Sequence, residues 1–286
     1  MTRRMVHSLA KAGFDVSGAE LYAKARPGYA SEVVNYIIDV LGRDKGTNTK
    51  RYVEVGSGTG KFTESFLKGY TKVLDSSKKI EWLAVEPSDG FRKEFERTIG
   101  TFPNVNIKAY GAPAESLPIK TPKTVDSILI AQAFHWMANI RSLKEFHRVL
   151  KPNGTVVMVW NSLDIDIPII SELEDMLNKH YKVAGEPPRY ITREWERVFE
   201  TSEAKELFSQ PTCWLGGYQK LLCSRQQIVD RILSISVVSA MSDSGKQSVA
   251  QEVLDIINNH PTTRNKCDGE ISIGYKSEVA VTQPRS

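Results

Sequence analysis

The sequence has few cysteines, no long apolar run and no block of like charge. Its three cysteines, Cys213, Cys223 and Cys267, include no C-x-x-C spacing, which favours a reducing compartment inside the cell and a cytoplasmic location. We predict no metal site. No apolar stretch approaches the roughly 20 residues of a membrane span, and acids and bases are interspersed to a formal net charge of +4. The charge pattern therefore favours neither nucleic acid nor a membrane as partner.

The composition that remains is that of an ordinary globular protein. The chain has 286 residues, of which 41% are hydrophobic and 25% charged, a length that suits one large α/β domain with a cap or two small domains. The segment from Met1 to Lys11 is basic, and no acid occurs before Asp15. It could be a weak organelle-targeting segment or a frayed basic N-terminus, and we favour the second.

The central part of the chain alternates short β-prone runs with helical patterns. This alternation is typical of a parallel sheet with crossover helices. Apolar residues at helical spacing, such as Phe91, Phe95 and Ile99, predict the connecting helices. We expect strands at 51–56, 80–85, 105–109, 124–131 and 154–160.

Beyond Asn161 the pattern changes to helices with two late strands. An apolar stripe predicts a helix over 169–181, and another helix is expected around Trp195. β-prone residues around Trp214 and the alternation over 271–281 predict strands that continue the sheet. The fold class is therefore α/β, a doubly wound, mostly parallel seven-stranded sheet with a helical cap.

Two of the later helices carry N-terminal signals. Each is expected to open with a Ser-x-x-Gln capping box, Ser224 to Gln227 and Ser244 to Gln247.

Three glycines at alternate positions follow the first β-prone run, in Glu-Val-Gly-Ser-Gly-Thr-Gly over 54–60. Glycines let the chain turn sharply and leave no side chain between backbone and ligand. A pyrophosphate site uses G-x-G-x-x-G with no fixed anion nearby, whereas Glu54 precedes this turn. A carboxylate suits a cationic nucleoside such as S-adenosylmethionine, which has an ammonium, a sulfonium and no phosphate. For the motif alone, a plain tight turn or another nucleotide fold is the alternative.

Carboxylates also follow the second and third strands. Glu86 ends the second strand, where a carboxylate can accept hydrogen bonds from both ribose hydroxyls of an adenosine; the alternative is a helix N-cap. After the third strand, Ala114 and Glu115 are candidates to read the amino edge of an adenine, and the alternative for Glu115 is a solvated loop acid.

The fourth strand runs into Ala-Gln-Ala-Phe-His-Trp over 131–136. Ligands of doubly wound sheets lie at the carboxyl ends of the strands, so Gln132, His135 and Trp136 should border the reacting centre. We expect Phe134 to be a core residue. The alternative places Trp136 in the core as well and makes His135 a helix N-terminal residue.

An arginine lies between two tyrosines ahead of the first strand, in Tyr22-Ala-Lys-Ala-Arg26-Pro-Gly-Tyr29. Arginine can bind a carboxylate with two hydrogen bonds, as an amino-acid tail such as that of methionine requires. A surface arginine beside a proline turn is the alternative.

Taken together, these motifs resemble the class I S-adenosylmethionine-dependent methyltransferases, a Rossmann-like family, and within it the small-molecule branch that includes trans-aconitate methyltransferase-like proteins. The resemblance covers Tyr22 to Asn161 and also includes Ala-Glu-Ser-Leu-Pro and Arg-Val-Leu-Lys-Pro-Asn-Gly. Members acting on nucleobase amino groups often have Asn- or Asp-Pro-Pro-Tyr where this chain has Ala-Gln-Ala-Phe, which argues against that chemistry.

The resemblance implies a role for each part of the chain. Residues 1–50 would be an N-terminal helical segment contributing to the cofactor site, 51–161 the S-adenosylmethionine-binding core, and 162–286 substrate cap helices and closing strands. It implies the following cofactor contacts: the methionyl part on Glu54, Gly56, Ser57, Gly58 and Gly60, the ribose on Glu86, the adenine edge on Ala114 and Glu115, and further contacts with Tyr22, Arg26 and Gln132.

These expectations lead to a functional hypothesis, O-methylation of a small, carboxylic acid acceptor. Gln132, His135, Trp136 and Trp160 should line the acceptor pocket, with helices after 165 as its cap. A carboxylate acceptor needs no base, whereas a phenol or alcohol would, and His135 is then the candidate. The alternatives are an NAD(P)-dependent oxidoreductase and a catalytically silent cofactor-binding protein.

Overall fold

The computed structural model describes residues 16–42 and 48–285, which form two compact units. The basic segment Met1–Lys11 lies outside the described residues. Each unit combines segments far apart in the sequence: unit 1 takes its described residues from 1–27, 161–187 and 218–276, and unit 2 from 28–160, 188–217 and 277–286. Among the described helices none is long and apolar enough to cross a bilayer. The functional division at residues 50 and 161 stays a prediction.

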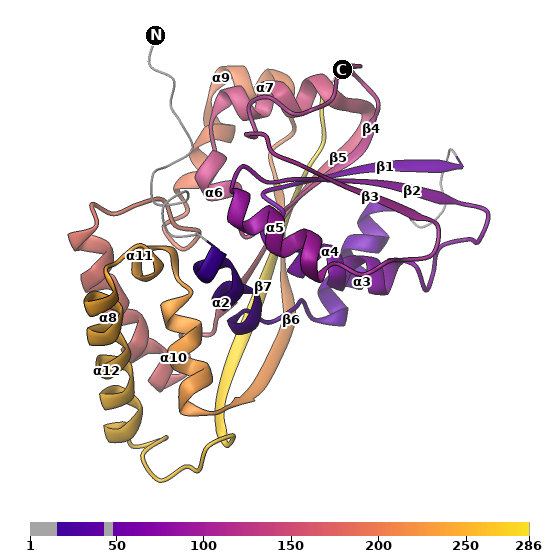
Figure 1. The fold of residues 1–286 in the computed structure, drawn as a ribbon. Coiled ribbons are helices and arrows are strands. Elements are labelled where there is room, and N and C mark those ends of the chain that lie inside the picture. The colour runs from indigo at the N-terminus through magenta and orange to yellow at the C-terminus, as the bar shows by residue number, and fades with distance from the viewer. Residues whose placement is uncertain (1–15, 43–47, 286) are drawn as a thin grey trace. The chain divides into compact units, whose positions relative to one another are not determined.

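Helices and strands alternate through unit 2 as the sequence pattern predicts (Figure 1). Three strands, β5 (Leu150–Leu163), β6 (Thr212–Cys223) and β7 (Ile271–Thr282), contribute residues to both units. The other elements of unit 2 are α3 (Ser31–Leu41), β1 (Thr49–Val55), α4 (Lys61–Tyr70), β2 (Lys79–Val85), α5 (Asp89–Thr98), β3 (Val105–Tyr110), β4 (Val125–Ala131), α6 (Phe134–Met137), α7 (Ile140–Val149), the 3-10 helix η1 (Glu194–Glu200) and α9 (Ser202–Leu207).

The strands form one seven-stranded sheet in the order β3-β2-β1-β4-β5-β7-β6. The pairings of β1 with β2, β1 with β4, β2 with β3 and β4 with β5 are parallel. An antiparallel bridge joins Phe208, before β6, to Pro284, after β7. The predicted seven-stranded α/β fold is therefore confirmed, and the sheet is mixed. The order doubles back at β1 and β4, which is where doubly wound sheets bind their ligands.

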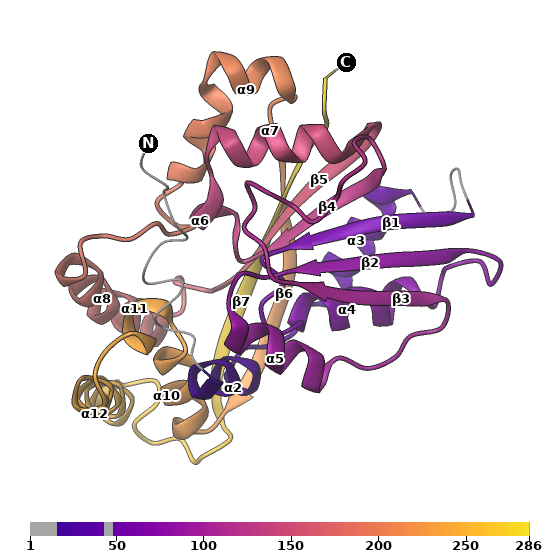
Figure 2. The same ribbon diagram turned by 45° about the horizontal axis from the view of Figure 1, so that its top comes forward.

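Each face of the unit 2 sheet has its own apolar core, and Figure 2 shows α7 and α9 along one face. Val53, Val55 and Ile128 pack with α6, α7 and η1, whereas Tyr52 and Trp82 pack with α3, α4 and α5 on the other face. Successive residues of β1 point to opposite faces, so Glu54 shares the α4 face with Tyr52. The central strand β4 is mostly buried and largely apolar, as expected for a parallel strand with both faces covered.

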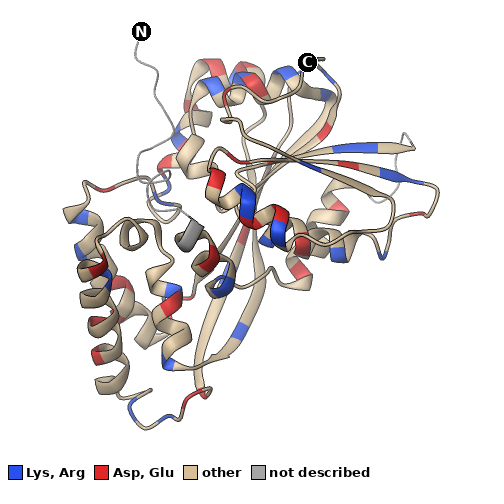
Figure 3. Ribbon diagram, viewed as in Figure 1, with Lys and Arg blue, Asp and Glu red and all other residues tan. Residues whose placement is uncertain are grey.

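Unit 1 is mainly helical, with a core built from α8 (Pro168–Val183), α10 (Arg225–Leu233), α11 (Ser236–Ser239), α12 (Asp243–Asn259) and the start of β7. Its remaining helix, α2 (Val16–Ala25), packs against α10. Basic and acidic residues both occur along α8, α10 and α12 (Figure 3).

Three local predictions can be compared with the structure. The capping box of Ser224 and Gln227 opens α10 as expected. The predicted box at Ser244 is wrong: α12 begins two residues earlier, with Ser242 accepting a hydrogen bond from the backbone N–H of Gly245. The helix expected around Trp195 is a 3-10 helix.

Candidate active site

The turn after β1 consists of glycines in the left-handed backbone region. Gly56, Gly58 and Gly60 have φ angles of 72°, 54° and 86°, which side chains rarely tolerate. A Cβ on Gly56 would lie 2.6 Å from the Cβ of Ala133, and one on Gly60 would lie 2.9 Å from the Phe95 ring. A Cβ on Gly58 would meet nothing within 4 Å. Packing thus requires the outer two glycines, whereas Gly58 leaves its backbone open on one side.

Hydrogen bonds join this turn to the tip of β2. The backbone N–H groups of Gly56 and Ser57 donate to the Val85 carbonyl at 2.8 and 3.2 Å. The next donor along the turn, the N–H of Gly58, reaches the Glu86 carboxylate at 3.0 Å. The predicted turn and the predicted ribose carboxylate therefore meet at the carboxyl ends of two neighbouring parallel strands.

Glu86 is 7% exposed, and each of its carboxylate oxygens accepts a backbone N–H. Ser88 donates the second, at 2.9 Å, and is itself the N-cap of α5, so Glu86 is not that cap. Burial raises the pKa of Glu86 to about 7, although the N–H groups of Ser88 and Gly58 oppose the shift. Arg92 holds the backbone carbonyl of Glu86 at 2.6 Å, a contact that the sequence pattern did not reveal.

Glu54 is fully buried beneath the turn, on the α4 face of the sheet. Thr63 of α4 donates a hydrogen bond to one of its oxygens. The other oxygen, Oε1, has no hydrogen bond of normal geometry among the described residues, although the Trp82 indole N–H acts on the carboxyl as a donor that opposes the rise of its pKa. Burial raises the pKa of this carboxyl to about 8, so without a cationic partner it is largely protonated at neutral pH. The prediction that Glu54 acts as a fixed anion therefore holds only if a cation is bound beside it.

The loop after β3 positions the adenine candidates. Ala114 is 6% exposed and packs in the apolar core of this face. Glu115 accepts a hydrogen bond from Asn139 Nδ2 at 3.0 Å, and Asn139 is the N-cap of α7. Glu115 is thus partnered by a side chain rather than only by solvent, and its role as an adenine reader stays a prediction.

The end of β4 adopts a conformation unusual for its residue type. Gln132 has a φ angle of 58°, and its backbone N–H donates to the Val159 carbonyl at 2.8 Å. A non-glycine residue in this region stores strain that often marks functional sites. The next residue, Ala133, is the one that a Cβ on Gly56 would meet. The structure thereby brings the β4 end against the glycine turn.

His135 is held by Trp160, whose indole N–H donates to His135 Nδ1 at 3.3 Å. Because an indole N–H can only donate, Nδ1 is the unprotonated nitrogen, and the proton of the neutral ring lies on Nε2. Burial, followed by the nearby positive charge of Arg189, lowers the pKa of His135 to about 3. At neutral pH this histidine is therefore a neutral hydrogen-bond donor at Nε2.

Aromatic residues surround that histidine. Trp160 is fully buried; it stacks on Tyr190, with ring centroids 4.8 Å apart, and packs at a tilt against Trp195, with ring centroids 4.6 Å apart. The rings of His135 and Trp136 lie 5.2 Å apart, and Trp136 is partly exposed. Phe134 is fully buried in the core, as predicted.

Three residues around these aromatics offer ligand atoms that lie within 4.8 Å of one another, namely Glu196, Cys213 and Glu278. Arg193 already bridges the two carboxylates, with Nη1 2.6 Å from Glu278 and Nη2 bonded to Glu196. The guanidinium thus supplies a cation to this cluster.

Tyr22 and Arg26, the remaining cofactor candidates, belong to unit 1. The Arg26 guanidinium lies over the Tyr22 ring, 4.8 Å from its centroid. Its Nε donates to Ser234 Oγ at 3.0 Å. The predicted contact of Arg26 with a methionine-type tail stays a prediction.

Comparison with known proteins finds relatives by sequence and by fold. Residues 53–158 match the methyltransferase domain family. A protein of Schizosaccharomyces pombe described as an uncharacterised methyltransferase-like protein is 35% identical over 182 residues, so the match spans only 62% of each chain. A malonyl-[acyl-carrier protein] O-methyltransferase of Paenibacillus sp. is 23% identical over 73% of this chain and 78% of that protein. A solved structure assigned as a type II methyltransferase from Anaeromyxobacter dehalogenans covers 90% of this chain and 97% of its own, with a TM-score of 0.54 and 18% identity, which supports the fold.

The match to the methyltransferase domain family covers the parallel part of the sheet, from β1 to β5. The predicted likeness to trans-aconitate methyltransferases in particular stays a prediction.

Proposed function

We propose that this protein transfers the methyl group of S-adenosylmethionine to a carboxylate oxygen of a small organic acid. The observation that carries the cofactor assignment is the hydrogen bond between Gly58 N–H and the Glu86 carboxylate. It ties the glycine turn to a buried carboxylate whose remaining acceptor sites suit the two hydroxyls of a ribose.

The residues of the turn fit this cofactor. Gly58 keeps its backbone accessible, because a Cβ there would meet nothing within 4 Å. The Oε1 atom of Glu54, without a hydrogen bond of normal geometry among the described residues, offers an acceptor for the ammonium of the methionyl part. A cationic ligand beside the two buried carboxyls, Glu54 and Glu86, would favour their ionised forms and lower their raised pKa values, so its charge and theirs would compensate each other.

The bound cofactor supplies a methyl group on an electrophilic sulfonium. The protein has to hold the acceptor oxygen in line with it and to keep water away. Gln132, at the strained end of β4, and Trp136 would border the reacting atoms, and the indole of Trp160 keeps the ring of His135 oriented.

The polarity of the His135 region favours an anionic acceptor. His135 presents an N–H rather than a basic nitrogen, and the charge of Arg189 lies close enough to depress its pKa. One oxygen of a carboxylate can accept from these donors while the other attacks. A phenol or alcohol would need a base, and the pKa of about 3 makes His135 a poor one.

Two further facts bear on the setting. The Paenibacillus relative is named a malonyl-[acyl-carrier protein] O-methyltransferase, and its malonyl group supports a carboxylate acceptor. The three cysteines are free, which is why we propose a reducing, cytoplasmic compartment.

The test is product analysis with purified protein. Cofactor carrying an isotope label in its methyl group should be incubated with a panel of mono-, di- and tricarboxylic acids, with their amides as matched controls. We expect a base-labile labelled ester from at least one acid and none from its amide. Labelled product from phenols or amines alone would contradict the carboxylate assignment while keeping methyl transfer.

A further inference from the structure

A buried carboxylate on β7 lies behind the aromatic residues that surround His135. Glu278 is 4% exposed, and it shares a face of β7 with Ala280, which packs in the apolar core beside α6, α7 and η1. Tyr190, 88 positions away in the sequence, donates its hydroxyl proton to this carboxylate. Arg193 donates to both carboxylate oxygens from Nη1, at 2.7 and 2.6 Å. Two partners from one short segment therefore hold the charge of Glu278.

That segment folds closely around the carboxylate. Arg193 precedes η1 with a left-handed φ angle of 59°, a conformation that costs a non-glycine residue free energy. Its backbone N–H donates to the Tyr190 carbonyl at 3.1 Å, and its guanidinium lies 5.7 Å from the centroid of the Tyr190 ring. Burial, followed by the hydrogen bond to Glu278, raises the pKa of Tyr190 well above its ordinary value. The hydroxyl therefore keeps its proton and stays a donor.

Tyr190 is one of two rings that pack on Trp160. The Tyr190 ring stacks on it with an interplanar angle of 25°, and the Trp195 ring packs at a tilt of 34°. The indole N–H of Trp195 has no hydrogen-bond partner in the part of the chain that the structure describes, whereas the Tyr190 hydroxyl is bonded to Glu278. The hydroxyl is therefore the polar anchor of this aromatic stack.

The position of Trp160 decides which nitrogen of His135 carries the proton. The indole N–H donates to Nδ1 at 3.3 Å, which leaves the proton of the neutral ring on Nε2. If the indole moved away, either nitrogen could carry the proton. Nε2 would then present a lone pair in part of the molecules, and a lone pair repels the oxygen of a carboxylate acceptor instead of donating to it.

We propose that Tyr190, anchored on Glu278, is a positioning residue that holds Trp160 and thereby keeps His135 protonated at Nε2. Groups that touch a substrate keep their geometry when packing and a further layer of hydrogen bonds lock their rotamers. The consequence for methyl transfer rests on the proposed function, because it requires His135 to face a carboxylate acceptor. The position of the proton does not, so the two can be tested apart.

The experiment is nitrogen NMR of the full chain with isotope-labelled histidine. The chain has five histidines, and a His135→Gln sample identifies the signals of His135. The two ring nitrogens have well separated shifts in a single neutral tautomer and averaged shifts in a mixture. Wild type is compared with Tyr190→Phe, Glu278→Gln and the double variant, and kcat and cofactor affinity are measured on the same samples. Tyr190→Phe removes only a hydroxyl and leaves Arg193 bound to Glu278.

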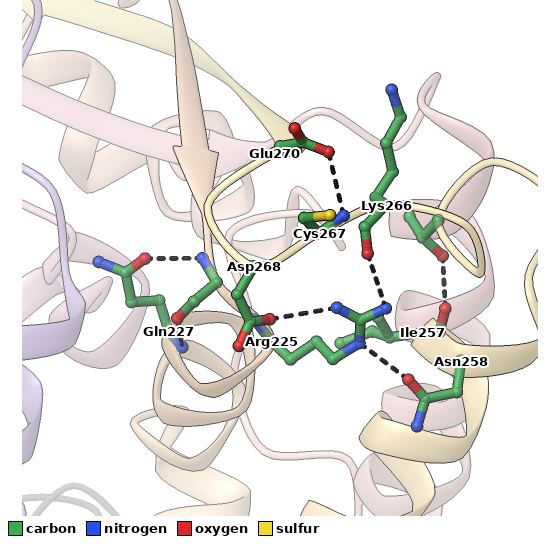
Figure 4. A network of polar contacts seen from close by, with 10 residues as sticks. Arg225, Gln227, Ile257, Asn258, Lys266, Cys267, Asp268 and Glu270 are labelled. Atoms are coloured by element: carbon green, nitrogen blue, oxygen red, sulfur yellow. Dashed lines mark hydrogen bonds and ion pairs between the residues drawn. The ribbon is translucent and has the colours of Figure 1, made fainter.

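The matched control is Asp268→Asn. Asp268 accepts from the guanidinium of Arg225 at 3.1 Å, as Figure 4 shows, in the same way that Glu278 accepts from Arg193. It belongs to unit 1, and its side chain is 67% exposed. This control separates the general loss of an arginine-bound carboxylate from the loss of the Tyr190 anchor.

We expect wild type and Asp268→Asn to show one tautomer of His135, with the proton on Nε2. Tyr190→Phe should move the shifts of both ring nitrogens towards their average and lower kcat for an acid acceptor by about tenfold, as the loss of a buried hydrogen bond would, with cofactor affinity unchanged. Glu278→Gln should have a smaller effect, since an amide oxygen still accepts. The double variant should lose no more than Tyr190→Phe, because both changes act on one contact.

Nitrogen shifts of His135 that are equal in wild type and Tyr190→Phe would overturn the positioning role, whether or not kcat falls. A wild-type His135 with its proton on Nδ1 would overturn it as well. If no carboxylic acid is methylated, the proposed function fails, and the nitrogen shifts still decide the role of Tyr190. Should Glu278→Gln not fold, the comparison of Tyr190→Phe with wild type is sufficient.

Discussion

The backbone N–H of Gly58 and the carboxylate of Glu86 are 3.0 Å apart and join the ends of two neighbouring parallel strands. This contact places a buried acceptor beside the most open position of the glycine turn. It is the structural basis of the cofactor assignment.

Replacing Glu86 by Gln should weaken S-adenosylmethionine binding by roughly tenfold to a hundredfold, because hydrogen bonds to a charged acceptor contribute about 1.5–3 kcal/mol. The amide keeps the size of the side chain. Calorimetric titration measures the change, with Glu81→Gln, a partly exposed acid on β2, as control. An unchanged dissociation constant in Glu86→Gln would remove Glu86 from the site.

Substitutions of two glycines of the turn, Gly56 and Gly58, should affect protein stability and cofactor binding to different extents. Gly58→Ala should cost about 1–2 kcal/mol of unfolding free energy through its left-handed backbone, but it should impair cofactor binding at least tenfold. Gly56→Ala adds a contact of 2.6 Å with Ala133 and should lose more stability. Urea denaturation and calorimetry on both variants test this pair, and equal stability losses with intact binding in Gly58→Ala would refute it.

Glu54 should make stability fall as pH rises. Its folded pKa of about 8 lies above the ordinary 4.5, so the folded state holds the proton more tightly. This contribution is complete below about pH 4.5 and is lost between there and pH 8, with a slope of about 1.4 kcal/mol per pH unit. Glu54→Gln should show a shallower fall in unfolding free energy over this range. Identical pH slopes in the two proteins would contradict the buried, protonated carboxyl.

His135 should act as a donor rather than a base. With a pKa of about 3, His135 stays neutral across the working pH range. The pH profile of kcat/KM for an acid acceptor should therefore have no inflection near pH 6.5 that depends on His135, and His135→Gln should leave the shape of the profile unchanged. His135→Phe should lower kcat/KM roughly tenfold to a hundredfold through the lost hydrogen bond, with cofactor affinity unchanged. An inflection near pH 6.5 that disappears in the variant would instead identify a general base.

Arg189 should select for ionised acceptors. Arg189→Gln should raise the KM for the acid about tenfold, as expected when one charged partner is lost, and leave the cofactor dissociation constant unchanged. Arg197→Gln is the control, since that side chain is 76% exposed. Equal KM values in the Arg189 and Arg197 variants would rule out a role for Arg189 in acceptor binding.

Features of the fold that depend on residues close in the sequence could be predicted, whereas features that depend on residues far apart could not. The first four strands begin and end within two residues of the predicted bounds, because short β-prone runs alternating with helical patterns predict them directly. The fifth begins at Leu150 rather than residue 154, because Leu150 pairs with Val125 before a register shift, and the regular pairing with β4 resumes at Thr155. Local turn signals could not reveal that pairing.

The same limit applies to the site. The glycine turn, Glu86 and His135 follow motifs that local spacing reveals. Arg189 and Glu278 lie far along the chain from their partners, and no short pattern marks them. The raised pKa of Glu54 depends on burial, and burial is a property of the packed structure that the local sequence does not give.

The most direct test of the account is calorimetric titration of the purified protein with S-adenosylmethionine and, separately, with NAD. We predict saturable binding of S-adenosylmethionine that Glu86→Gln and Gly58→Ala both weaken, and no binding of NAD. Saturable NAD binding without S-adenosylmethionine binding would contradict it and leave an oxidoreductase as the better assignment.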